Sequence, residues 1–210
     1  MAFLNLRERE IQLKIVYYGP ANAGKTANLR HISSRLRDSL QSRLLTITPD
    51  GTRTVFLDFM AFTITNINGF DLKVRLYTVP GHPQYAQVRK TLLKGADGIV
   101  FVADPAAMRK TNMLSLLDLC SNLLANGKNI ARIPLVFQVN KCDLGEREHV
   151  LLPPSTLLHD LNSEYRRPYF IASAAEGKNV FCTLKKIIAM VMDQVESKYR
   201  EVASERRRVL

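Results

Sequence analysis

The chain has 210 residues, 46% of them hydrophobic and 23% charged, a balance typical of one soluble domain with a buried core. Lysine and arginine outnumber aspartate and glutamate by 30 to 19, which gives a net charge of +11. Three widely spaced cysteines form no CxxC pair, which argues against a disulfide scaffold and a zinc knuckle. No run approaches 18 apolar residues and the amino-terminal segment is charged, so the sequence predicts neither a membrane span nor a signal peptide.

Apolar segments alternate along the chain with segments whose apolar residues recur at helical spacing. An Asn-Gly pair at 68–69 favours a hairpin between the strands on either side. Residues 98–103 and 135–139 are almost entirely apolar, as strands buried on both faces of a parallel sheet are. The predicted strands are residues 11–18, 55–65, 70–79, 98–103, 135–139 and 169–172. The predicted helices are residues 25–37, residues 108–124 and an amphipathic helix within 178–210.

These elements predict an α/β fold of three layers, built on a mostly parallel six-stranded sheet with one antiparallel hairpin strand. Length and composition predict a single domain over residues 1–210. Its core is expected at about 9–195, and a C-terminal helix with a basic tail at about 178–210. We expect the apolar stripe of that helix to pack on the core.

Residues 19–26, Gly-Pro-Ala-Asn-Ala-Gly-Lys-Thr, match the phosphate-binding pattern GxxxxGK[ST] between a predicted strand and a predicted helix. Backbone N–H groups of such a loop, together with the amino end of the helix, attract phosphate oxygens. Lys25 is expected to reach the β- and γ-phosphates, and the Thr26 hydroxyl to bind Mg²⁺. The predicted nucleotide contacts of this loop are Gly19, Asn22, Ala23, Gly24, Lys25, Thr26 and Ala27.

A second motif, Asn-Lys-Cys-Asp at 140–143, directly follows an apolar strand and matches the pattern NKxD. The Asp143 carboxylate can accept hydrogen bonds from N1–H and the 2-amino group of guanine, a donor pair that adenine lacks. Lys141 is expected to lie along the base and to brace the phosphate loop. Ser-Ala-Ala at 173–175 follows the last predicted strand and resembles the loop whose backbone N–H meets guanine O6. The predicted base contacts are therefore Asn140, Lys141, Asp143, Ser173 and Ala174.

Together with their neighbours, these motifs resemble the MglA family of bacterial Ras-like small GTPases over about residues 9–195. The segment Leu-Tyr-Thr-Val-Pro-Gly at 76–81 is the most informative, because Thr78 stands where most Ras-like proteins have aspartate and MglA proteins have threonine. The resemblance implies the Ras-like G domain of the P-loop NTPases, with GTP or GDP and Mg²⁺ bound. The other matching segments are 14–29, 53–59, 94–104, 139–144 and 176–185.

The resemblance further implies a switch that hydrolyses GTP to GDP slowly alone and faster with a Roadblock-fold, MglB-like activating protein. Effectors of the GTP state would regulate cell polarity or motility. The chain is expected in the cytoplasm, recruited to a cell pole or the inner membrane surface when GTP is bound. The positive charge is compatible with peripheral membrane association, no lipidation motif is present, and nucleic acid is not expected because no aromatic-basic stripe accompanies the charge.

Catalytic residues also follow from the resemblance. Among four threonines in the segment 46–54, the alignment selects Thr54 as a second Mg²⁺ ligand. Arg53 matches an intrinsic arginine finger, whose planar guanidinium spreads positive charge over phosphate oxygens. Gly81 would sense the γ-phosphate through its backbone N–H, and His82 stands where MglA proteins have the glutamine that orients the attacking water.

Two roles and three alternative functions stay open at this stage. Imidazole can orient water, so His82 does not exclude hydrolysis, yet it leaves a nucleotide-gated binding protein with negligible hydrolysis as an alternative. Asp58 is a candidate for the outer coordination sphere of Mg²⁺. Two other roles explain this carboxylate equally well: a salt bridge, or protection of a sheet edge against pairing. The second alternative is a P-loop ATPase or kinase, although the NKxD motif argues against it. The third is a basic protein that binds nucleic acid.

Overall fold

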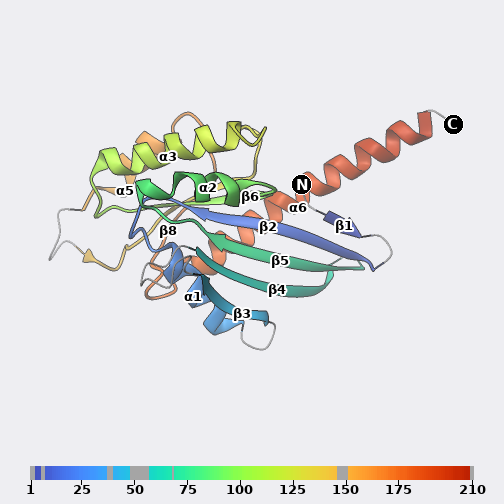
Figure 1. Ribbon diagram of the computed structural model, residues 1–210, viewed down its shortest axis with the longest axis horizontal. Coiled ribbons are helices and arrows are strands. Elements are labelled where there is room, and N and C mark those ends of the chain that lie inside the picture. Colours follow the sequence, from blue (N-terminus) through green and yellow to red (C-terminus); the bar gives the residue numbers. More distant parts are fainter. Residues whose placement is uncertain are drawn as a thin grey trace.

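The computed structural model describes residues 3–5, 8–36, 40–47, 57–67, 69–145 and 151–208. One sheet runs through the molecule and helices cover both of its faces (Figure 1). The strands are β1 (Phe3–Asn5), β2 (Glu10–Tyr18), β3 (Leu40–Ile47), β4 (Leu57–Ile67), β5 (Phe70–Thr78), β6 (Gly98–Ala103), β7 (Leu135–Val139) and β8 (Tyr169–Ile171). The helices are α1 (Lys25–Arg35), a short 3-10 turn η2 (Pro83–Tyr85), α2 (Ala86–Leu93), α3 (Arg109–Leu124), α5 (Pro154–Asn162) and α6 (Val180–Arg208).

The sheet confirms the predicted fold class and all six predicted strands. Its order is β3-β4-β5-β2-β6-β7-β8, with β1 paired to β2 as well. The pairs from β5 through β2, β6 and β7 to β8 are parallel, whereas β3 with β4, β4 with β5 and β1 with β2 are antiparallel. The expected count of six misses β1 and β3, which extend the sheet to eight strands. Each pairs antiparallel with the next strand along the chain, and neither has the apolar run of an inner strand.

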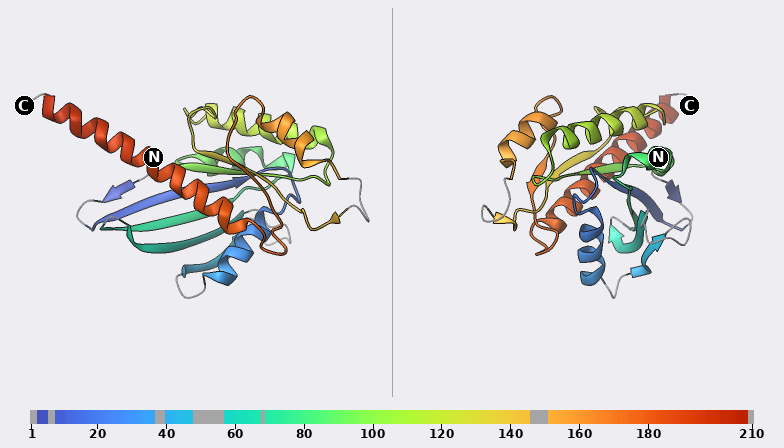
Figure 2. Two further views of the ribbon diagram at one scale, coloured as in Figure 1. Left: turned by 180° about the vertical axis from the view of Figure 1, so that it is seen from behind. Right: turned by 60° about the vertical axis from the view of Figure 1, so that its left-hand side comes forward.

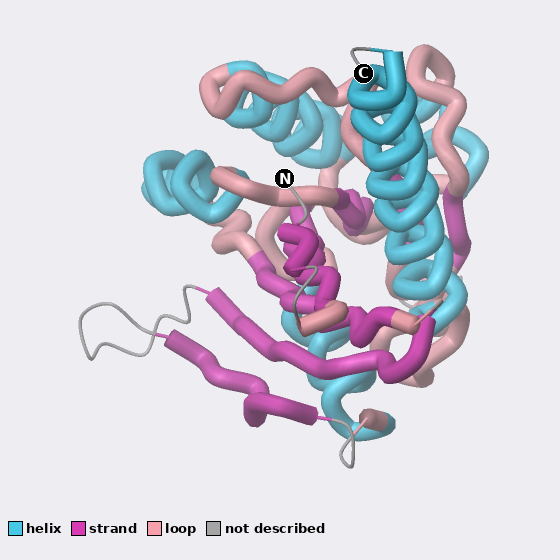
Figure 3. The backbone as a smooth tube through the Cα atoms, turned by 90° about the vertical axis from the view of Figure 1, so that its right-hand side faces the viewer, coloured by secondary structure: helices cyan, strands magenta, loops and turns pink. Residues whose placement is uncertain are grey.

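Each face of the sheet buries its own apolar cluster, which gives the three predicted layers. Along β2 the side chains alternate, with Ile15 and Tyr17 in one cluster and Val16 and Tyr18 in the other. Helices α1 and α6 contribute to the first cluster, and α2, α3 and α5 to the second. Figure 3 shows α6 running along its face of the sheet. Strands β6 and β7 are buried at every residue, as their apolar sequences predict.

Helix α6 packs on the core through its first half and then leaves it. The buried residues Leu184, Ile187 and Val191 confirm that its apolar stripe faces the core. A Cβ on Gly98 would lie 2.7 Å from a methyl group of Val191, so glycine lets β6 approach the helix closely. The remainder of α6 projects beyond the sheet (Figure 2). Within the described ranges, no helix combines the length and apolar character needed to cross a membrane.

Candidate functional site

The phosphate-binding loop connects the carboxyl end of β2 to the first residue of α1. Gly19 and Gly24 have φ angles of +140° and +93°, a conformation that favours glycine. A Cβ on Gly19 would lie 2.1 Å from the carbonyl oxygen of Val102, and one on Gly24 would lie 2.1 Å from Nδ2 of Asn140. A side chain at Gly19 would therefore push the phosphate-binding loop away from β6, and one at Gly24 would push it away from the loop that contains Asn140.

Lys25 folds back over the phosphate-binding loop and is 6% exposed. Its Nζ donates hydrogen bonds to the carbonyl oxygens of Gly19, at 2.9 Å, and Pro20, at 2.6 Å. The ammonium group thus lies above the loop in which the phosphates are expected. This placement agrees with the predicted role of Lys25 in phosphate binding.

The buried ammonium of Lys25 should make nucleotide binding proton-linked. Burial lowers the pKa of Lys25 to about 7, helped by Arg89 and opposed by Asp104 and Asp58. A phosphate beside Nζ adds negative charge and raises this pKa, so GDP binding at pH 8 should take up most of one proton. Calorimetry in buffers of different ionisation enthalpy measures that uptake. It should vanish in the Lys25→Met variant, and its absence in the unmodified chain would contradict the assignment.

Thr26 and Asp58 form the metal-facing side of the site. The Thr26 hydroxyl donates a hydrogen bond of 2.5 Å to Oδ2 of Asp58, which is fully buried on β4. The Thr78 hydroxyl accepts the Asp58 backbone N–H at 2.8 Å and donates to Asp58 Oδ2 at 3.0 Å. Thr78 therefore positions a carboxylate supplied by the neighbouring strand. Because β4 lies between β3 and β5, Asp58 does not protect a sheet edge.

This oxygen set fits Mg²⁺ held jointly by protein and nucleotide. Magnesium prefers oxygen ligands and is usually bound by one or two protein groups together with substrate phosphates. Thr26 supplies a hydroxyl and Asp58 a carboxylate beside it. Among the described residues there is no group of three or more His, Cys, Asp or Glu side chains that could bind a metal without a nucleotide.

Asn140 joins the three predicted motifs. It is 2% exposed, and its Nδ2 donates to the carbonyl oxygen of Ala23 at 2.8 Å. Its Oδ1 accepts the backbone N–H of Ala174 at 2.9 Å. The phosphate loop, the NKxD loop and the loop after β8 are therefore in direct contact, although they lie up to 151 positions apart, from Ala23 to Ala174. In this arrangement the Ala174 N–H supports Asn140, while Asn140 holds the phosphate and base loops together.

Lys141 and Asp143 are placed differently within the base loop. Lys141 Nζ forms a 2.6 Å ion pair with Asp104, whose side chain is 4% exposed. Sequence reasoning assigned no role to Asp104, although its position directly after the buried strand β6 is a signal that could have identified it. Asp143 is exposed, and the backbone N–H of Cys142 donates to Ala172 at 3.0 Å, so the loop is anchored beside the end of β8. Asp143 is thus free to reach a base lying over the loop.

Two buried amide side chains, which sequence reasoning missed, support the phosphate loop from below. Asn28 on α1 donates to the carbonyl oxygen of Gly24 at 3.0 Å. Gln138 on β7 donates to Oδ1 of Asn28 at 2.9 Å. Ser173 is also fully buried, and its Oγ accepts the backbone N–H of Glu176 at 3.1 Å, which closes the loop after β8 into a turn. These polar contacts fix the loops that surround the expected ligand site.

The loop after β5 lies directly against the phosphate loop. A Cβ on Gly81 would lie 2.2 Å from the backbone nitrogen of Ala21, so only glycine permits this approach. The neighbouring His82 is exposed, with its ring 6.2 Å from that of Tyr85 between centroids. The structure thus places Gly81 next to the expected phosphates and leaves the His82 side chain accessible to solvent.

Arg89 on α2 fastens this loop, and sequence reasoning missed it. Its side chain is 8% exposed, and its guanidinium donates to the carbonyl oxygens of Pro80 at 3.3 Å and His82 at 2.7 Å. It also forms a 2.7 Å ion pair with Asp118 on α3, which in turn accepts the Tyr18 hydroxyl. The loop that carries Gly81 is therefore tied to the core through α2 and α3.

The catalytic predictions for Arg53 and Thr54 lie outside the described residues, which stop at Ile47 and resume at Leu57. Thr48 and Thr52 fall in the same segment. Their proposed roles stay predictions.

Comparison with known proteins agrees with this site. The model of the Ras family matches residues 14–193. The mutual gliding-motility protein MglA of Myxococcus xanthus (strain DK1622) is 40% identical over 197 residues, which cover 93% of this chain and 98% of MglA. DnaJ homolog subfamily C member 27 of Danio rerio is 21% identical over 90% of this chain and 65% of its own length, and human Ras-related protein Rab-19 is 23% identical over 80% and 69%. The chain belongs to the Ras family and is an MglA-like small GTPase, a GTP hydrolase.

Proposed function

We propose that this chain is a GTP/GDP switch whose GTP state acts on effectors to control cell polarity or motility. The observation that carries the proposal is the contact of three loops at Asn140, because a phosphate loop and a guanine-reading loop must lie at a fixed separation to hold one nucleotide. The name of the similar MglA protein, mutual gliding-motility protein, supports motility as the process. The whole chain, residues 1–210, would form one domain for this purpose.

The nucleotide would span this edge of the sheet. Its phosphates would lie on the loop from Gly19 to Ala27, with Gly81 on the γ-phosphate side. Its guanine would meet Asp143 and lie along Lys141, which Asp104 holds in place. The loop that contains Ser173 and Ala174 would border the pocket for the base.

Magnesium would be held by Thr26 and by Thr54, with Asp58 accepting a hydrogen bond from Thr26 behind it. When bound, Mg²⁺ neutralises charge on the β- and γ-phosphates. Lys25 would add a positive charge on the same oxygens, since its ammonium already lies over the loop. The protein side of the reaction is therefore positioning and charge neutralisation.

Arg53 is the residue proposed to accelerate hydrolysis when an MglB-like Roadblock-fold protein binds. Replacing it with alanine should leave GTP affinity unchanged and lower partner-stimulated hydrolysis by about 1000-fold, the contribution that arginine fingers make. Single-turnover phosphate release, with and without the partner, measures the effect. The exposed Arg30→Ala on α1 serves as the matched control. Normal stimulation of the Arg53→Ala variant would remove Arg53 from the mechanism.

A second candidate function is a nucleotide-gated binding protein with negligible hydrolysis. The exposed His82 at the position of the water-orienting glutamine favours it. The same assay separates the two functions: phosphate release from the unmodified chain with a Roadblock partner supports the GTPase switch, and its absence supports the gated binder. We place either protein in the cytoplasm, recruited to a pole or the inner membrane surface in the GTP state.

A further inference from the structure

Helix α3 carries an apolar stripe on its outer face. Four large apolar side chains there are between 42% and 66% exposed, and Met108, directly before the helix, is 79% exposed. At 100° per residue the four fall within an arc of roughly 100°, whereas Leu116, Leu119 and Leu123 face the core. The members of the stripe are Met113, Leu114, Leu117 and Leu124. A contiguous exposed apolar patch, unlike a single exposed apolar side chain, marks an interaction site.

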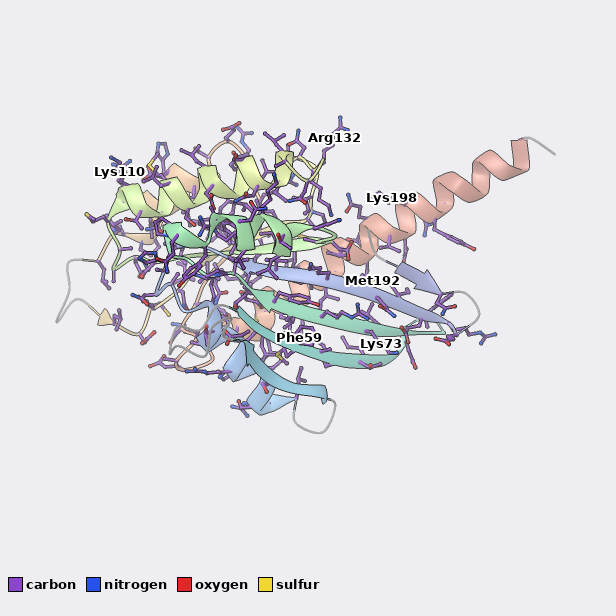
Figure 4. The ribbon with its side chains drawn as sticks, viewed as in Figure 1. Phe59, Lys73, Lys110, Arg132, Met192 and Lys198 are labelled. Atoms are coloured by element: carbon purple, nitrogen blue, oxygen red, sulfur yellow. The ribbon has the colours of Figure 1, made fainter. Side chains whose placement is uncertain are left out.

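Basic side chains stand at both ends of the stripe. Lys110 lies within the same arc at the start of α3, next to Arg109. At the other end, Asn126 donates to the carbonyl oxygen of Lys90 at 2.9 Å, which places Lys90 beside the last turn of α3. Arg132 follows in the next loop, and Figure 4 shows Lys110 and Arg132 at opposite ends of the helix. The stripe is therefore flanked by positive charge at both ends.

Acidic groups around the stripe are largely neutralised or buried. Across residues 82–134, all of which the structure describes, Asp97 and Asp104 are at most 9% exposed, and Asp118 is paired with Arg89. On α5, the side chain of Asp160 is 5% exposed and paired with Arg109, and Glu164, which follows α5, is exposed. The positive rim therefore meets little opposing charge from the chain itself.

The shape and charge of this surface decide between its possible occupants. The stripe lies on the outer side of α3, and both views of Figure 2 show this helix at the outer surface of the molecule. A second copy of the chain would bring its own basic rim against this one, which like-charge repulsion opposes. A layer of anionic lipid needs no matching shape and supplies both negative headgroups and an apolar interior.

We propose that α3 is a docking surface for an anionic lipid bilayer. The stripe enters the boundary between headgroups and acyl chains, and the side chains of Lys90, Lys110 and Arg132 meet lipid phosphates. The inference rests on α3 and its neighbours, not on nucleotide binding, so it can fail while the switch function holds. It names the surface by which this chain would meet a membrane.

The test is cosedimentation of the full chain with vesicles of phosphatidylcholine containing 30% phosphatidylglycerol, set against pure phosphatidylcholine. The unmodified chain should bind the anionic vesicles, and less at 0.5 M salt, because exposed charges are then screened. Leu114→Ser with Leu117→Ser should lower the partition coefficient about tenfold or more, since apolar area is lost. Lys90→Gln with Lys110→Gln should lower it about tenfold on anionic vesicles only.

A matched control removes the same charge elsewhere. Lys185→Gln with Lys186→Gln changes two exposed lysines on α6, in the opposite layer of the fold, and should retain vesicle binding. GDP affinity and thermal unfolding, measured on every variant, show that the loss is confined to the membrane surface. Vesicle binding that is absent in the unmodified chain, or equal in all variants, overturns the proposal. Absence would leave an acidic protein surface as the occupant of the stripe.

Discussion

Replacing Asp143 with asparagine should weaken GDP binding by about 100-fold or more and allow xanthosine diphosphate to bind in its place. The carboxylate accepts both N1–H and the 2-amino group of guanine, and asparagine presents an N–H group where an acceptor is needed. Xanthine has an oxygen in place of the 2-amino group and so restores a complementary pair. Titration with fluorescent GDP and xanthosine diphosphate measures both changes.

The control for this exchange is Asp193→Asn, which makes the same chemical change at an exposed position on α6. It should leave both affinities as they are in the unmodified chain. Asp143 is itself exposed, so its replacement has little effect on folding. Unchanged GDP affinity in Asp143→Asn would show that the base is bound elsewhere.

A second effect on nucleotide binding is expected at Asp58. Replacing it with asparagine removes the carboxylate that accepts the Thr26 hydroxyl, and should reduce the Mg²⁺-dependent gain in GDP affinity about tenfold. Thr78→Val removes the hydroxyl that positions Asp58. It should also reduce the Mg²⁺-dependent gain in GDP affinity, but by a smaller factor than Asp58→Asn. GDP affinity in Mg²⁺ and in EDTA gives the gain for each variant.

Thr63→Val is the matched control for Thr78→Val. Thr63 lies on the same strand as Asp58, and its buried hydroxyl has no hydrogen-bond partner among the residues that the structure describes, so its removal should not change the Mg²⁺-dependent gain. If EDTA weakens binding to the unmodified chain and to Asp58→Asn by the same factor, Asp58 takes no part in holding the metal.

Sequence alone was sufficient for the parts of the site that are contiguous motifs. The loop from Gly19 to Thr26 and the pair Asn140 and Lys141 lie between buried strands and helices, so the flanking pattern fixes where they sit in the fold. The apolar runs of β6 and β7 and the helical period of α6 were equally clear. These features depend on neighbours within about ten residues, where local spacing determines structure.

The contacts that assemble the site were beyond sequence reasoning, because they join residues far apart in the chain. Thr78 holds Asp58 from a neighbouring strand, and Arg89 reaches Asp118 on another helix. Such pairs depend on strand order and helix packing, which composition and period do not contain. Strand β3 was missed for another reason: its mixed sequence lacks the apolar run of an inner strand, and it becomes a strand through antiparallel pairing with β4, the next strand along the chain.

The most direct measurement is a comparison of GDP and ADP binding by the unmodified chain in the presence of Mg²⁺. If the loops joined at Asn140 hold one guanine nucleotide, GDP should bind at least about 1000-fold more tightly than ADP, because adenine leaves the Asp143 carboxylate without its donors. Equal affinities for the two nucleotides would contradict the assignment of the base loop and, with it, the proposed switch.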